Sequence, residues 1–273
     1  MHIKRKTIKA IGNGYSAHHY FRLSDKKRKE VLDKLDKKGL KKLTDLIKIS
    51  KQEIFKAHLK RFLEIAEGNI DTPVYLIDET LIEENMKVLR YVKDRTGCKI
   101  LHALKAYATF ATFPIMRKYL DGVCASGLNE ARLGFEKFKK EVHTFGAAYK
   151  DVDMVDIIKY SDVVIFNSFY QLEKFGKSVK ERGKEIGIRV NPGYSDIKVE
   201  MYNPCAAYSR LGVVCEVFEK YYNRFSHLID GLHFHALCEQ NADSLERVLN
   251  AFNERFGPYI KKFKTLKWVN FGG

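Results

Sequence analysis

The sequence contains few cysteines and prolines and no long apolar run, and each shortage excludes a class of protein. Its 273 residues include 5 cysteines and 5 prolines. The number of cysteines is odd and no C-x-x-C pair occurs, so neither a disulfide framework nor a zinc site is indicated. No apolar run reaches the roughly 18 residues that a membrane span requires, and the basic start lacks the apolar segment of a signal peptide. We therefore expect a cytoplasmic protein with reduced thiols, no metal centre and no membrane contact.

Positive charge is concentrated in one part of the chain. The net charge is +15, and residues 1–70 carry 19 Lys and Arg against 8 Asp and Glu, whereas residues 71–273 carry 30 against 26. Within the basic part, residues 24–67 place apolar side chains at helical spacing, and Ser50 with Glu53 forms a capping-box pattern. This pattern predicts an extension of two or three amphipathic helices whose lysines face solvent. Binding of an acidic partner or a nucleic acid through these helices is the less favoured alternative.

Residues 71–273 form the second predicted domain, in which short β-type runs alternate with helix-sized stretches. The predicted strands are residues 73–78, 99–105, 122–126, 141–147, 162–168, 186–192, 229–236 and 266–273. Alternation at this spacing implies parallel pairing with right-handed crossovers. Since no G-x-G-x-x-G turn follows the first strand, the pattern favours a (β/α)8 TIM-type barrel over a dinucleotide-binding sheet.

In such a barrel the chemistry lies at the carboxyl ends of the strands. The polar and glycine residues near these ends are Lys105, Ser126, Gly146, Asn167, Ser168, Arg189, Asn191, His233, His235, Gly272 and Gly273. The set includes an amine nucleophile, an imidazole that could stack on a ring, and a glycine pair whose amides could approach an anion closely. We therefore expect a ligand to bind at this edge of the sheet.

Lys105 ends an apolar strand, where an isolated buried ammonium is costly. Either its amine reaches water, or a covalent partner makes burial tolerable. A desolvated lysine is a competent nucleophile toward an aldehyde, and a nearby phosphate-binding glycine pair suggests that the aldehyde is pyridoxal 5'-phosphate. Each signal alone has a plainer interpretation as a surface lysine, a core histidine or an ordinary turn. Their agreement in strand order is what supports a cofactor site.

Six stretches of the second domain carry a family resemblance. They read HALKAYAT, NSFYQLEKF, IRVNPGYS, YNPCAAYSRLG, GLHFHALCEQ and WVNFGG. In this order they resemble the carboxynorspermidine (carboxyspermidine) decarboxylases, which belong to the alanine-racemase/ornithine-decarboxylase group of pyridoxal-phosphate enzymes. The likeness runs from about Thr72 to Gly273. GLHFHALCEQ discriminates best, because ornithine and diaminopimelate decarboxylases resemble it only in the G-x-x-F-H part.

The resemblance implies roles for five residues. Lys105 matches the lysine that bonds to the aldehyde of the cofactor, and His235 matches the histidine that stacks on the pyridine ring. Gly272 and Gly273 match the start of the phosphate-binding glycine run, and Arg189 matches, more loosely, an arginine under the cofactor. The implied carboxy-lyase reaction is loss of CO2 from carboxynorspermidine or carboxyspermidine, which gives norspermidine or spermidine in polyamine biosynthesis.

The resemblance also changes the expected strand count and the expected completeness of the site. Residues 73–78 would lie outside the barrel, which leaves seven barrel strands, and the sequence stops within the glycine run. Family members continue with a last barrel strand, a glutamate that pairs with the pyridine nitrogen, and a β-domain that completes the site across a homodimer. We therefore expect an incomplete barrel with two unpaired edges.

Three interpretations of such a chain are left open. It is one part of a decarboxylase whose C-terminal half is encoded separately, an inactive remnant that still takes up the cofactor at Lys105, or an interaction protein that uses its basic helices. We expect no turnover by the isolated chain, because the partner of the pyridine nitrogen and the β-domain are missing.

Overall fold

The computed structural model describes residues 59–272, apart from residues 66, 69, 72 and 239. The chain divides into two compact units, residues 1–77 and residues 78–273. The domain boundary that the sequence suggests, between residues 70 and 71, stays a prediction.

Most of the basic extension lies outside the described residues. This applies to the predicted capping box at Ser50 and Glu53, and also to Gly273 at the other end of the chain. Residues 59–65 are described and helical, and most of their apolar side chains are exposed. The helical prediction is thus confirmed for this stretch, and the other predicted helices stay predictions.

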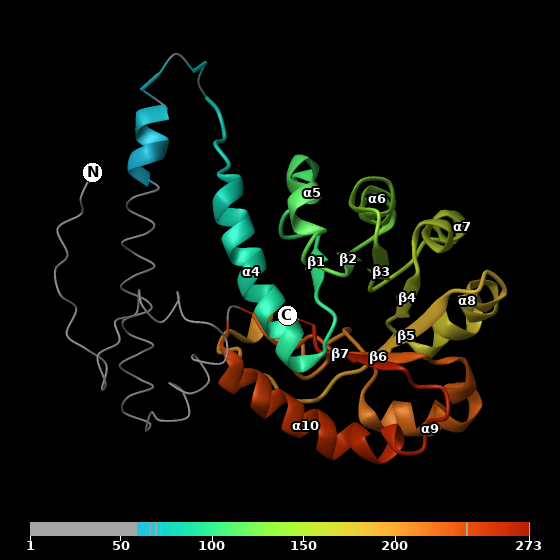
Figure 1. Ribbon diagram of the computed structural model, residues 1–273. Helices are drawn as coiled ribbons and strands as arrows, with labels where there is room; N and C mark the ends of the chain where they lie inside the picture. The colour runs from blue at the N-terminus through green and yellow to red at the C-terminus, as the bar shows by residue number, and fades with distance from the viewer. Residues whose placement is uncertain (1–58, 66, 69, 72, 239, 273) are drawn as a thin grey trace. The chain divides into compact units, whose positions relative to one another are not determined.

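Seven parallel strands form one curled sheet, and their order in the sheet is their order in the sequence (Figure 1). The strands are β1 (Leu101–Ala103), β2 (Gly122–Ala125), β3 (Glu141–Phe145), β4 (Val163–Phe166), β5 (Glu185–Arg189), β6 (Gly231–His233) and β7 (Trp268–Asn270). Each strand pairs in parallel with the next one along the chain. The predicted incomplete barrel is confirmed, with β1 and β7 as the edge strands of the described sheet.

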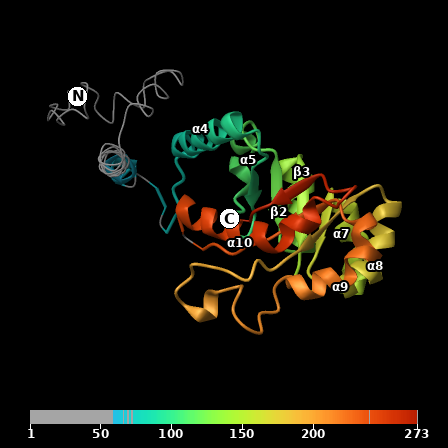
Figure 2. The ribbon, with the colours of Figure 1, turned by 90° about the horizontal axis from the view of Figure 1, so that it is seen from below.

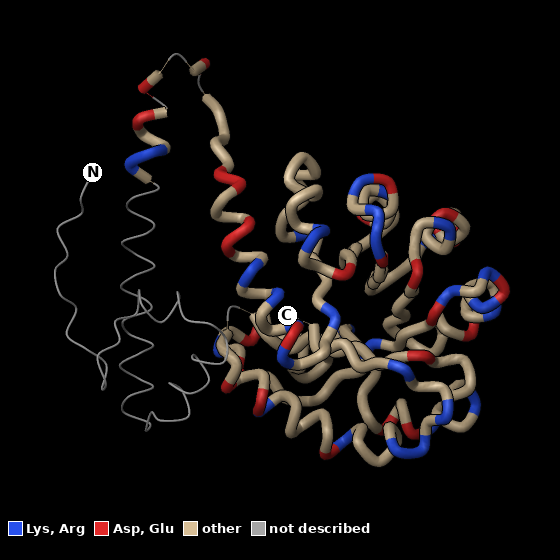
Figure 3. Tube along the Cα trace, viewed as in Figure 1, with Lys and Arg blue, Asp and Glu red and all other residues tan. Residues whose placement is uncertain are grey.

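Helices connect the strands and lie around the outside of the curled sheet (Figures 1 and 2). The α-helices are α4 (Glu79–Thr96), α5 (Phe113–Met116), α6 (Leu128–Leu133), α7 (Asp151–Tyr160), α8 (Phe169–Glu181), α9 (Cys215–Phe225) and α10 (Ala242–Ile260). The shorter helical turns are η1 (Phe110–Thr112), η2 (Gly134–Phe138, a π-turn), η3 (Glu200–Tyr202) and η4 (Ser226–Leu228). Basic and acidic residues are intermixed along the helices (Figure 3), as the nearly balanced charge of residues 71–273 predicts. None of the described helices is long and apolar enough to cross a membrane.

Residues 73–78 do not form the predicted strand. They are extended without any β pairing to the rest of the described chain, and Val74 and Tyr75 are exposed, Tyr75 at 98%. An apolar, β-type sequence does not make a strand unless a neighbour supplies the backbone hydrogen bonds. The segment ends where Asp78 caps α4, accepting the amide of Thr80 at 2.8 Å.

Two apolar clusters join the sheet to its helices. The larger one packs β4, β5 and β6 against α7 to α10 and includes the fully buried rings of Phe166, Phe218 and Phe234. The smaller one packs β1 to β3 against α4 to α6, where Phe113 and Phe138 meet edge to face at 5.2 Å. Burial of these side chains is the main source of stability and fixes the strands whose ends carry the site.

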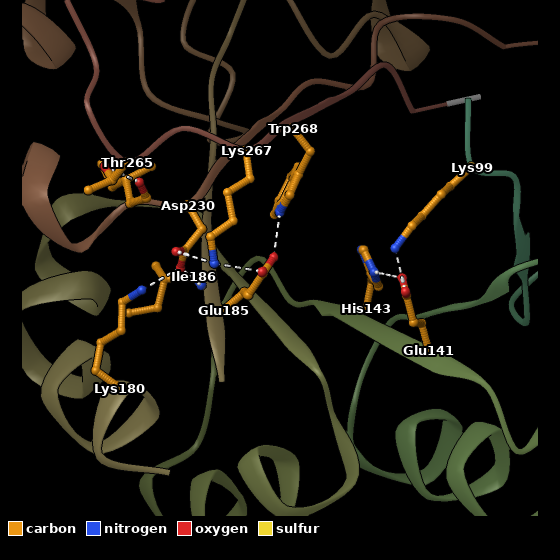
Figure 4. Close-up of polar contacts among 11 residues, drawn as sticks. Lys99, Glu141, His143, Lys180, Glu185, Ile186, Asp230, Thr265, Lys267 and Trp268 are labelled. Carbon is orange, nitrogen blue, oxygen red and sulfur yellow. Dashed lines mark hydrogen bonds and ion pairs between the residues drawn. The ribbon is translucent and has the colours of Figure 1, made fainter. Parts of the chain in front are cut away.

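Ion pairs gather at the amino ends of the strands (Figure 4). Lys99, just before β1, pairs with Glu141 at the start of β3. Lys267, just before β7, pairs with Glu185 at the start of β5 at 2.8 Å. Alternate strands of a barrel place their side chains in common layers, and these pairs form a charged layer at this end.

The indole of Trp268 fills the interior next to that charged layer. Its Nε1 donates a hydrogen bond to Glu185 Oε2 at 2.8 Å, and its ring lies 5.9 Å from the imidazole of His143 (Figure 4). A Cβ added to Gly187 or Gly231 would lie 2.7 or 2.2 Å from ring atoms of Trp268. Glycine is therefore required on β5 and β6 so that the ring can cross the interior.

Candidate active site

Lys105 lies just beyond the carboxyl end of β1. The strand ends at Ala103, and residues 104–106 form a turn in which the amide of Ala106 donates to Ala103 O at 3.1 Å. Lys105 is exposed, so the expectation that a strand carries it into a buried position is wrong. The reason is that the strand stops two residues earlier, and the turn leaves the amine in contact with water. The covalent partner that the sequence suggests for this amine stays a prediction.

Lys105 and Arg189 both lie within electrostatic reach of His235. Burial, together with the positive charges of Lys105 and Arg189, lowers the pKa of His235 to about 4. The imidazole is therefore neutral at pH 7. The structure thus brings together the amine, the guanidinium and the imidazole that the sequence singled out at or just beyond the carboxyl ends of β1, β5 and β6.

Arg189 is a buried cation with few polar partners among the described residues. The residue is 5% exposed, its Nη2 donates to His235 O at 3.2 Å, and its guanidinium lies 4.8 Å from the centre of the Phe145 ring. Burial lowers the pKa of Arg189 to about 10, and the like charge of Arg210 acts in the same direction. The group stays charged at pH 7, and no carboxylate in the described part of the chain pairs with it. A desolvated guanidinium with spare donors is suited to binding an anion.

Gly272 follows β7 in a tight turn. Its φ of 72° is in the left-handed region that favours glycine, and an added Cβ would lie 2.6 Å from Phe234 O and 2.8 Å from His235 Nδ1. Its amide donates to Asn270 Oδ1 at 2.8 Å, so this N–H already has a partner within the protein. The phosphate-binding role of Gly272 and Gly273 stays a prediction.

Two asparagines at strand ends hold the long segment between β5 and α9. Asn167 Nδ2 donates to Arg210 O and Asn167 Oδ1 accepts the amide of Gly212, both at 2.8 Å. Asn191 Oδ1 accepts the amide of Gly193 at 2.8 Å. The sequence marked these asparagines as groups that could orient a ligand, and the structure uses their amides to position backbone.

Other polar strand-end positions serve the turns that follow them. The amide of Gly146 donates to Tyr149 OH at 2.9 Å, and the amide of Ser126 donates to a carboxylate on α6. Ser168 caps α8 with its hydroxyl. These contacts explain why such residues follow each strand without giving them a role in binding.

Sequence reasoning missed Cys124 and Asn270, which face the same interior. Burial raises the pKa of Cys124 to about 11, while the charge of Lys105 acts in the opposite direction, so the two side chains are close. Because side chains on one face of a strand recur every second residue, both positions could have been found by counting back two from Ser126 and from Gly272. Among the described residues, no group of three or more His, Cys, Asp and Glu could hold a metal ion.

The arrangement fits an anionic cofactor that bears an aldehyde. An exposed amine can reach the aldehyde, a buried guanidinium without an acidic partner can face the anion, and a neutral imidazole lies beside both. A glycine turn too tight for any Cβ closes the same edge. These features lie at the carboxyl edge of a curled sheet of seven parallel strands, which is an incomplete (β/α)8 barrel.

Solved structures share this fold. Carboxynorspermidine decarboxylase from Campylobacter jejuni, complexed with norspermidine, matches with a TM-score of 0.65 and 38% identity over 75% of this chain and 51% of that one. Diaminopimelate decarboxylase from Helicobacter pylori, complexed with L-lysine, matches with a TM-score of 0.65 over 77% and 57% of the two chains. Its identity is 16%, so this second likeness concerns the fold alone.

The curated relatives narrow the class of decarboxylase that this chain resembles. A carboxynorspermidine/carboxyspermidine decarboxylase of Campylobacter jejuni is 42% identical over 204 residues, 75% of this chain and 51% of the relative. A carboxyaminopropylagmatine decarboxylase of Synechocystis is 33% identical over 206 residues, 76% and 52% of the two chains. No family model matches the chain.

The matched part of this chain is homologous to the carboxynorspermidine/carboxyspermidine decarboxylases, and the resemblance seen in the sequence is confirmed. The chain spans about half the length of the curated relatives it matches.

Proposed function

We propose that this chain contributes the barrel half of an active site that decarboxylates carboxynorspermidine or carboxyspermidine with pyridoxal 5'-phosphate. The meeting of Lys105, Arg189 and His235 at one edge of the sheet carries the proposal. The identity to named decarboxylases supports the substrate class, a carboxylated polyamine. The activity belongs to a protein with the full site, of which this chain matches about half.

Each part of the cofactor would contact particular residues of this chain. Lys105 Nζ would hold the aldehyde, and His235 would lie against the ring. Arg189 and the turn at Gly272 and Gly273 would face the anionic groups. When bound, the cofactor supplies a sink for the electron pair left as the α-carboxylate departs as CO2.

The side chains of this half would then serve binding and proton transfer. In the overall reaction one C–C bond breaks, and the carbon that loses CO2 gains a proton. Lys105 Nζ is accessible at the site and can hold and deliver that proton. The neutral imidazole of His235 adds an apolar face without a further positive charge, while charged Arg189 compensates the negative charge of the ligand.

Cofactor capture by the full chain tests the proposal. Added pyridoxal 5'-phosphate should give a visible absorbance band. Borohydride should bleach this band by reducing the C=N bond to a C–N single bond, which leaves the added mass permanently on the peptide that contains Lys105. Lys105→Ala should abolish the band, and Lys177→Ala, at an exposed position on α8, should keep it. Absence of the band, or labelling of other lysines with Lys105 unmodified, would contradict the proposal.

Turnover is a separate measurement. We expect no CO2 release from carboxynorspermidine by this chain alone, and release once the rest of the site is supplied as a second polypeptide. A chain that shows the absorbance band but never turns over with its complement would be an inactive remnant.

A further inference from the structure

His233 is a buried imidazole that the proposed chemistry does not use. It is the last residue of β6, and His235 follows two residues later, beyond the end of the strand. Only 8% of the residue is exposed, and its ring lies 5.6 Å from that of Phe145. Burial lowers the pKa of His233 to about 3, and the charge of Arg189 acts in the same direction. The ring is therefore neutral, with one N–H to donate.

That N–H points to Asn270 on the neighbouring strand. His233 and Asn270 are partners in the register of β6 and β7, which places the imidazole beside both the side-chain amide and the backbone carbonyl of Asn270. His233 Nδ1 has no partner among the described residues, so Nε2 is the nitrogen that donates. A buried polar atom without a hydrogen-bond partner costs free energy and calls for an explanation. We infer that the hydrogen bond made by the other ring nitrogen, Nε2, is the reason for a histidine at this position.

The side chain of Asn270 also binds the backbone of the glycine turn. Its Oδ1 accepts the amide of Gly272 at 2.8 Å, and an amide oxygen has two lone pairs, so it can accept from both neighbours. The turn has no room to adjust, because a Cβ on Gly272 would lie 2.8 Å from both Cα and Nδ1 of His235. A chain of hydrogen bonds therefore runs from inside the barrel to the place where the turn meets the imidazole at its edge.

We propose that His233 is a positioning residue that, through Asn270, fixes the turn at Gly272 beside His235 and so sets where an anionic group of the ligand binds. This inference rests on the proposed function, since the ligand is the cofactor of that site. The plainer alternative is a core histidine that only fills space. The two differ in what a substitution does to the recognition of the phosphate compared with the recognition of the rest of the cofactor.

Binding of pyridoxal 5'-phosphate and of pyridoxal, which lacks the phosphate, separates these alternatives. Both affinities would be measured on the full chain by equilibrium dialysis for the wild type, His233→Leu and His233→Gln. We expect His233→Leu to reduce the preference for the phosphorylated form by about tenfold, the equivalent of one good hydrogen bond. His233→Gln should retain most of the preference, because its amide nitrogen can take the place of Nε2. His227→Leu, at an exposed histidine on η4, should change neither affinity.

A second variant tests the same role without changing His233, in case His233→Leu does not fold. Asn270→Ala removes the acceptor in the middle of the chain of hydrogen bonds and should reduce the preference to the same extent. Combined with His233→Leu it should cause no further loss, because the two residues act in series. Thermal unfolding of each variant would identify those that do not fold.

Each remaining outcome decides between the proposals. If His233→Leu and Asn270→Ala fold and lower both affinities equally, or neither, the positioning role is wrong while the cofactor site stands. If the wild type binds neither pyridoxal 5'-phosphate nor pyridoxal, the proposed function fails and the positioning role with it.

Discussion

The two ends of the sheet differ in how their charges are compensated. At the amino end, lysines accompany the carboxylates in three pairs: Glu141 with Lys99, Glu185 with Lys267, and Asp230 with Lys180 (Figure 4). At the carboxyl end, Lys105 and Arg189 both lie within electrostatic reach of His235, and neither forms an ion pair with an acidic residue in the described part of the chain. The charges of the amino end are paired within the described chain, whereas the two cations of the carboxyl end have no acidic partner there and could bind an anionic ligand.

This difference separates stability from binding. The ion pairs and the packed indole at the amino end hold neighbouring strands together. Barrels commonly use that end for stability. A buried cation without a partner costs free energy, and it is found where a ligand can compensate it. We therefore expect substitutions at the amino end to change the free energy of unfolding, and substitutions at the carboxyl end to change ligand affinity.

The largest loss of stability should come from Gly231→Ala at the amino end. The new Cβ would lie 2.2 Å from two ring atoms of Trp268, and the indole could not move without breaking its bond to Glu185. Overpacking of this kind costs about 3 kcal/mol when the neighbour is held rigidly. Denaturant unfolding, followed by the fluorescence of Trp268, the only tryptophan, measures the effect.

Gly257→Ala is the matched control. Gly257 lies within α10, and an added Cβ there meets no atom within 4 Å. Pro258 follows Gly257 and disfavours the helical conformation of a residue that carries a Cβ, which offsets the gain in helix propensity. The same change of residue should therefore alter the free energy of unfolding by less than about 1 kcal/mol. Equal unfolding free energies for the two variants would show that Trp268 does not fill the interior as described.

Asp230→Asn should cause the next largest loss. Burial alone would raise the pKa of Asp230, but hydrogen bonds from Lys180 and from the amide of Ile186 outweigh it and hold the pKa below its ordinary value. The asparagine keeps the shape and loses the charge that these donors bind. We expect a loss of about 2 kcal/mol at pH 7, measured by denaturant unfolding.

The pH dependence of that loss follows from the direction of the pKa shift. A carboxyl whose pKa is lower in the folded state stabilises the fold above its unfolded pKa of about 4, and the contribution disappears as the pH falls through the folded pKa. The wild type and Asp230→Asn should therefore differ by a constant amount from pH 7 to about pH 5 and converge in more acidic solution. A difference that grows toward low pH would contradict the assigned ionisation.

Sequence patterns predicted the barrel because its elements are local. Strand–helix alternation located all seven strands, since each apolar run is long enough to bury and is bounded by turns. The same reasoning failed at residues 73–78, because a β-type run becomes a strand only beside a partner, and whether a partner is present is not a local property. The resemblance to known decarboxylases placed this segment outside the barrel, which the apolar pattern alone could not do.

Sequence reasoning predicted which residues meet at the carboxyl edge of the sheet, but it placed one of them in the wrong environment. Counting strand ends found Lys105, Arg189 and His235, because parallel strands bring their carboxyl ends to one edge. The burial of Lys105 was wrong, since the exact point at which β1 ends depends on pairing with β2. Asn270 was missed because its role depends on the register with β6, which an isolated sequence does not show.

The smallest effect on stability should come from Arg189→Met at the carboxyl end. The guanidinium gives up one hydrogen bond and its contact with Phe145, while the cost of burying its charge disappears. The free energy of unfolding should therefore change by no more than about 1 kcal/mol. The affinity for pyridoxal 5'-phosphate, measured by spectral titration, should fall by at least about tenfold, because a charge-assisted contact to the ligand is lost.

Arg224→Met provides a matched control for that result. Arg224 on α9 lies 4.9 Å from the centre of the Phe225 ring, much as Arg189 lies over Phe145, but it is exposed and already pairs with Glu173. Its loss should leave the affinity for the cofactor unchanged. If both variants bind the cofactor as the wild type does, the unpaired charge at the carboxyl end has no ligand of this kind, and the contrast between the two ends concerns packing alone.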